Sequence, residues 1–79
     1  MTLQSMLEVL RKQPFEPFRI VMSSGQAYKV PRRNMAFLTK FDLLVGIGEA
    51  DDGLPDGFKI CPLDQIVAVE PLYDPMPYP

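Results

Sequence analysis

Residues 18–30 read FRIVMSSGQAYKV and give the clearest structural signal in the chain. Apolar and polar residues alternate on both sides of a Ser-Ser-Gly segment, which is typical of two short strands joined by a tight turn. We therefore predict a β-hairpin with strands at 18–22 and 26–30.

The register of this hairpin follows from the same pattern. A two-residue turn would place Lys29 on the apolar face, which contradicts the alternation. A three-residue turn with Gly25 in a left-handed conformation instead pairs Ile20 with Tyr28 and sends the charged residues outward. The sequence therefore predicts a positive φ at Gly25, which is a structural turn residue.

An amphipathic helix is expected before the hairpin, over residues 3–12. Thr2 is a suitable N-cap, and leucine and methionine recur at helical spacing behind it. Pro14 ends the helix, because the residue before a proline is disfavoured in the helical conformation. A helix this short is stable only when its apolar stripe packs on something.

Three more strands are expected after the hairpin, at 43–48, 58–61 and 66–70, from short apolar runs bounded by turn residues. The segment 32–40, between the hairpin and the first of these strands, is expected to leave the sheet. Asn34 could cap a single helical turn there.

This order predicts a mainly β fold, α+β by element count. We expect the N-terminal helix to be followed by a five-stranded, strongly bent small barrel, with residues 1–72 as a single domain. Residues 73–79 contain three prolines and are expected to form an extended tail.

Composition excludes several classes of protein. The 79 residues allow one domain with one core, and they include no histidine and one cysteine, Cys61. A lone cysteine forms no internal disulfide, which fits a reducing, cytoplasmic location, and no signal peptide or membrane span is evident. Without histidine the usual base near neutral pH is missing, so we expect no enzyme activity and no catalytic residues.

Charge divides unevenly along the chain. Residues 1–40 hold seven basic and two acidic side chains, a net +5, whereas residues 41–79 hold one basic and eight acidic, a net −7. The two halves either form separate charged faces or mix when their strands pair.

Two segments are candidates for partner contact. The first is a basic cluster that could contact a polyanion, although the sequence pI of about 4.9 disfavours RNA. The second is the tail, where aromatic residues among prolines resemble ligands of aromatic grooves. The residues are Arg32, Arg33 and Asn34 in the cluster and Tyr73, Met76 and Tyr78 in the tail.

A metal site is not expected. Asp51, Asp52 and Asp56 are close in sequence, but their spacing does not match a calcium-binding EF-hand loop. We expect no metal, no cofactor and no small-molecule substrate.

The layout resembles the Sm-like and SH3-like small barrels. Residues 18–30 are similar to the first Sm hairpin, and residues 58–69 (FKICPLDQIVAV) are similar to the second strand pair. This resemblance implies ring oligomers formed by edge-strand pairing and RNA held by loop residues. The histidine of the bacterial Sm signature is absent, and so is the aspartate and asparagine set of Sm RNA sites.

A second resemblance covers nearly everything but the tail. Residues 13–25 (QPFEPFRIVMSSG) resemble small uncharacterised bacterial proteins with a PFxPFRI signature followed by SxG. That resemblance implies no activity.

The sequence therefore predicts a non-enzymatic protein-interaction or assembly module that binds a protein partner or itself, with edge-strand pairing as the mode of self-association. The alternatives are an Sm-like RNA-binding oligomer and an accessory or regulatory domain of an enzyme complex.

Overall fold

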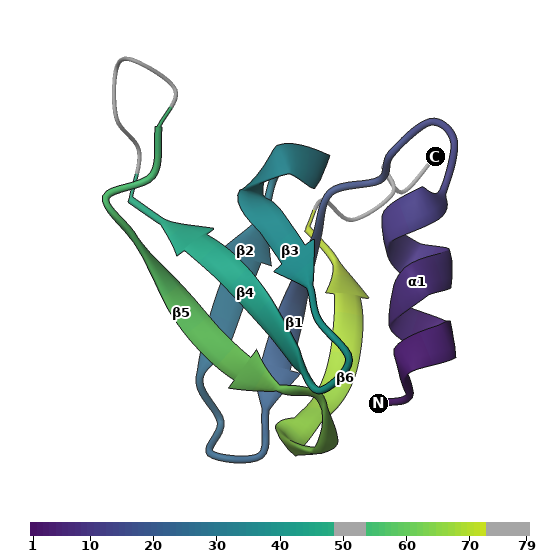
Figure 1. Ribbon diagram of the computed structural model, residues 1–79, viewed down its shortest axis with the longest axis vertical. Coiled ribbons are helices and arrows are strands. Elements are labelled where there is room, and N and C mark those ends of the chain that lie inside the picture. The colour runs from purple at the N-terminus through teal and green to yellow at the C-terminus, as the bar shows by residue number, and fades with distance from the viewer. Residues whose placement is uncertain (49–53, 73–79) are drawn as a thin grey trace, which may run out of the picture.

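The computed structural model describes residues 1–48 and 54–72. Over these ranges, one helix and six strands form a mixed α+β fold that is mostly strand (Figure 1). The strands make two antiparallel three-stranded sheets, β2-β1-β6 and β3-β4-β5. The elements are α1 (Leu3–Arg11), β1 (Phe18–Met22), β2 (Ala27–Val30), β3 (Ala36–Leu38), β4 (Asp42–Ile47), β5 (Gly57–Pro62) and β6 (Ile66–Pro71). No closed barrel is formed by these strands.

The predicted hairpin is confirmed with its register. Ile20 lies opposite Tyr28, and Arg19 lies opposite Lys29. Gly25 has a φ of 92°, and its amide donates to the carbonyl of Met22 at 2.8 Å. The turn therefore has the left-handed residue that the alternation required.

Strand β6 completes the first sheet by pairing with β1. The Nε of Arg19 donates to a carboxylate oxygen of Glu70 at 2.8 Å across this pair. Because β1 and β2 come from the basic half of the chain and β6 from the acidic half, the charges mix within this sheet. Both side chains are nearly half exposed, so the ion pair adds little stability, about 0–1 kcal/mol.

The excursion at 32–40 differs from the prediction. Asn34 does not cap a helical turn: it lies inside a 3₁₀ turn, Arg33–Met35, whose N-cap is Arg32 with no side-chain capping bond. The next three residues form strand β3, paired with β4, instead of continuing a helix. Burial of Met35 and Ala36 against the core explains this, because an extended chain after the turn points Ala36 inward and Phe37 outward.

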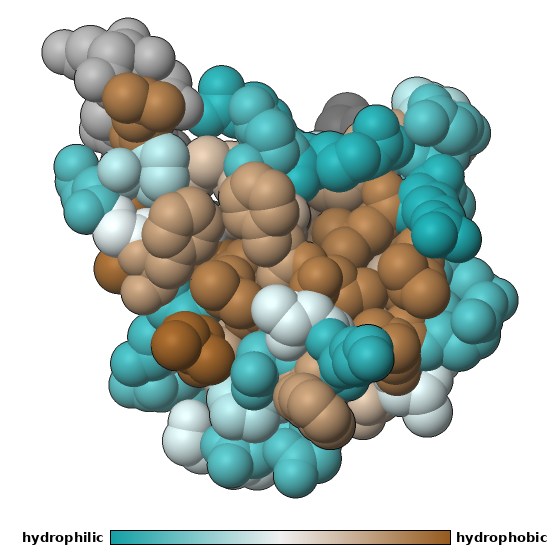
Figure 2. Space-filling model, viewed as in Figure 1, coloured by the Kyte–Doolittle hydropathy of each residue, from teal (hydrophilic) through white to brown (hydrophobic). Residues whose placement is uncertain are grey.

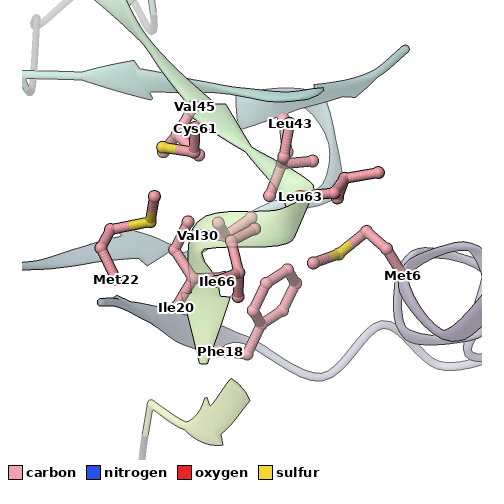
Figure 3. Close-up of a cluster of buried hydrophobic side chains, with 11 residues drawn as sticks. Met6, Phe18, Ile20, Met22, Val30, Leu43, Val45, Cys61, Leu63 and Ile66 are labelled. Carbon is pink, nitrogen blue, oxygen red and sulfur yellow. The ribbon is translucent and has the colours of Figure 1, made fainter. Parts of the chain in front are cut away.

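Helix α1 ends one residue before the predicted limit. The Thr2 hydroxyl accepts the amide of Ser5 at 3.0 Å, which confirms the cap. Met6 is fully buried and points from α1 toward Phe18 (Figure 3). Burying a methionine side chain contributes about 1.5–3 kcal/mol, which explains how so short a helix stays docked.

The core lies between the two sheets and under α1. Both sheets and the turn before β6 supply its apolar side chains, several of which are labelled in Figure 3. The members are Met6, Phe18, Ile20, Met22, Val30, Ala36, Leu43, Val45, Cys61, Leu63 and Ile66.

Candidate functional site

The outward face of the β3-β4-β5 sheet carries a row of apolar side chains. Phe37 lies opposite Leu44, and Leu44 lies opposite Ile60, so the three residues cross the sheet in register. Phe37 is 59% exposed and Ile60 is 61% exposed. The row lies on the side of the sheet away from the core, since its strand neighbours Ala36, Leu43 and Cys61 are buried.

Phe58 extends this row into a patch, and a further exposed ring, Phe41, lies directly before β4. Phe58 is 48% exposed, and its ring meets that of Phe37 edge to face with 6.2 Å between centroids. Its cross-strand partner is Gly46, against which the side chains of Met35 and Pro55 pack. Phe41, in the turn before β4, is 77% exposed. We call Phe37, Phe41, Leu44, Phe58 and Ile60 the apolar face.

Figure 2 views the molecule from this side. Apolar residues gather over β3, β4 and β5 and continue toward α1, and hydrophilic residues surround this apolar area. The largest apolar patch on a typical monomer covers roughly 300–600 Å² and is often functional. The apolar face is therefore the strongest candidate for a binding surface.

The side chains of strand β5 face the opposite sides of the sheet from those that its sequence pattern suggests, and this orientation produces the apolar face. Lys59 alternates with Phe58 and Ile60, which would ordinarily place the two apolar residues inside. The structure has the opposite phase: Lys59 lies opposite the core residue Val45, with its ammonium 6.0 Å from the centre of the Tyr28 ring. Burial of Cys61 in the core fixes that phase.

Of the predicted basic cluster, Arg33 has a structural role. Its Nε donates to the carbonyl of Leu10 and its Nη2 to the carbonyl of Lys12, both at 2.8 Å. Its guanidinium lies 5.2 Å from the centre of the Phe15 ring. Arg33 therefore closes the C-terminal end of α1, where backbone carbonyls lack helical partners.

Arg32 and Asn34 lie beside the apolar face. With Phe15, Pro17, Pro31 and Phe37 they line an open groove of about 810 Å³. No described residue bonds the guanidinium of Arg32, so it remains available to a ligand. Arg33 lines the same groove, so the structure brings all three predicted residues to the border of the patch.

A second open groove, of about 820 Å³, has a basic rim. Arg19, Lys29 and Arg32 line it together with Tyr28 and the end of β4, and no acidic side chain in the described ranges does so. Three cations are therefore adjacent on this surface.

The remaining predicted residues divide into two groups. Gly25 is the structural turn described above. Tyr73, Met76 and Tyr78 lie outside the described residues, as do Asp51 and Asp52.

Cys61, the one cysteine of the chain, is not placed to act as a nucleophile. Burial raises the pKa of the Cys61 thiol, Lys59 opposes this and Asp42 adds to it. The thiol therefore stays protonated and enclosed, unlike a reactive cysteine. Within residues 1–48 and 54–72, no three acidic, cysteine or histidine side chains are grouped to hold a metal ion.

Every sheet edge carries features that oppose strand addition. Strand β3 has three residues, β5 has an inward lysine and ends at Pro62, and β6 carries Glu70 and ends at Pro71. Pro31 directly follows β2. Short edges, inward charges and prolines are known protections against edge pairing. We therefore take the apolar face, and not these edges, as the candidate contact surface.

No helix in the part of the chain that the structure describes has the length and apolar character needed to cross a membrane. Comparison with protein-family profiles, curated proteins and solved structures found no match to this chain.

Proposed function

We propose that this chain is a non-enzymatic protein-interaction module whose contact surface is the apolar face. The observation that carries the proposal is the exposure of Phe37, Phe58 and Ile60 on one side of one sheet, with the exposed Phe41 directly before β4. Aromatic residues are enriched at the centres of protein interfaces, where they supply large contact area for few rotatable bonds.

The fold supports this use by holding the patch on rigid elements. Phe37, Leu44 and Ile60 are on three paired strands, and the inner faces of those strands are packed into the core. A partner surface would therefore meet preformed side chains and lose little conformational entropy on binding.

Site-directed photo-crosslinking tests the proposal. A benzoylphenylalanine is placed at Phe58, and in a matched control at Val67, which is 64% exposed on β6 in the other sheet. We expect a discrete protein adduct from position 58 and none from position 67. Equal or absent crosslinking at the two positions would contradict the proposal.

A second candidate function is binding of single-stranded RNA, favoured by the basic groove. Arg19, Lys29 and Arg32 could contact phosphates, and Tyr28 could stack on a base. We expect short oligouridine to bind at low salt, with loss of binding at physiological salt and in Arg32→Ala. Absence of binding at the lowest salt would exclude this function.

A further inference from the structure

We infer that the partner of the apolar face is a second copy of this chain, packed sheet against sheet. The inference rests on the proposed function and names the occupant of the same surface. It replaces edge pairing by face pairing, since each edge is protected while the face is open.

The area of the patch matches what a dimer needs. Large apolar side chains bury roughly 150–250 Å² each, so the exposed fractions of Phe37, Phe58 and Ile60 correspond to roughly 350 Å² of apolar surface on the sheet, and Phe41, directly before β4, adds roughly 150 Å². A stable interface buries roughly 800 Å² on each partner, of which roughly 65% is apolar in homodimers. The apolar face alone thus supplies the non-polar share of one such interface.

The chemistry of the patch is self-complementary. In a two-fold dimer the same surface meets itself, so charges at its centre would be brought against like charges. The central row of Phe37, Leu44 and Ile60 contains none. Charged residues lie at its borders: Arg32 shares a groove with Phe37, and Lys40 and Asp42, of opposite sign, flank Phe41 in the chain.

The geometry of the sheet also suits this packing. Two twisted sheets pack face to face at roughly 10 Å with their strands within roughly 30° of each other. The rings of Phe37 and Phe58 contact each other edge to face, and the side chains of Met35 and Pro55 fill the space beside Gly46, so this part of the surface is closed. Side chains from a second sheet would pack against the outer surfaces of these rings and of Ile60, as facing sheets pack in β-sandwiches.

Sedimentation equilibrium on the full chain, from micromolar to near-millimolar concentration, tests the inference. The variants are Phe37→Ser/Ile60→Ser and, as the control, Val67→Ser on the other sheet; circular dichroism and urea melts verify that each folds. We expect a dimer for the wild type and the control, and a dissociation constant roughly 100-fold or more higher for the double variant. If the double variant does not fold, Ile60→Ser alone is used, with an expected weakening of roughly tenfold or more.

Three results would overturn the inference: a wild-type monomer at every concentration, a double variant that dimerises like the wild type, or a control that weakens equally. The photo-crosslinking separates these failures from failure of the proposed function. An adduct of twice the chain mass supports the second copy. An adduct with a different protein rejects the second copy but keeps the interaction module, and the absence of any adduct rejects both.

Discussion

Replacing Arg33 with alanine removes the side chain that closes the C-terminal end of α1. Two hydrogen bonds to the carbonyls of Leu10 and Lys12 are lost, together with the contact over the Phe15 ring. The carbonyls are left to water, because both bonds lie at an exposed site. The change therefore acts through lost bonds and leaves no buried group unpaired.

The size of the effect follows from those contacts. Each exposed hydrogen bond contributes about 1 kcal/mol, and the cation–π contact about 0.5 kcal/mol. We expect Arg33→Ala to lower the free energy of unfolding by about 2.5 kcal/mol, which lowers the Tm of a domain of this size by about 10–20 °C. Arg32→Ala is the matched control. The Arg32 side chain bonds no described residue, so we expect its removal to change the free energy of unfolding by no more than about 0.5 kcal/mol.

Urea unfolding followed by circular dichroism measures both variants under one set of conditions. Hydrogen exchange of the amides in α1 adds a local readout, since loss of Arg33 should speed exchange in the last turn of the helix. Equal stability of Arg33→Ala and Arg32→Ala would refute the structural role of Arg33 and return it to the candidate contact residues.

Three further predictions follow from named positions. Gly25→Ala should lower the free energy of unfolding by about 1 kcal/mol, because Gly25 has a positive φ. Gly57→Ala is the control, since Gly57 has open space around it and no positive φ, and it should be neutral or slightly stabilising in the same urea melts. An equal destabilisation by both changes would contradict the turn assignment. Met6→Ala should cost about 2–5 kcal/mol and release α1 first in hydrogen exchange; an α1 that stays protected would show that the helix does not depend on this contact. Because burial raises the pKa of Cys61 above its ordinary value of 9.0, the unfolded chain loses this proton before the folded one does, so stability should fall as pH rises above about 9. Cys61→Val should remove that part of the fall, and identical pH profiles would disprove the assignment.

The hairpin could be predicted from sequence because every signal in it is local. Strict alternation sets the two faces, and the one glycine in the turn allows only one register that keeps Lys29 outside. The helix was predictable for the same reason, since its cap and its stopping proline are adjacent to it. Strand β3 was missed because three residues are too few to show a period, and pairing with β4 holds them extended.

The apolar face could not be predicted because it depends on contacts between distant residues. Alternation around Lys59 suggests that Phe58 and Ile60 point inward, and the packing of Cys61 reverses this. Likewise, nothing next to Arg33 in the sequence shows that its partner is the end of a helix more than 20 residues earlier. The one sequence feature that points to this orientation is Cys61, because a cysteine is usually buried and its neighbour Ile60 must then face the other side of the strand.

Fluorine NMR on the chain with its five phenylalanines fluorinated tests most directly whether two copies meet through the apolar face. As the protein concentration rises, we expect the resonances of Phe37, Phe41 and Phe58 to shift, while that of the buried Phe18 stays in place as the internal control. Outward rings that keep their resonances over the whole range, or a shift of equal size at Phe18, would contradict the account.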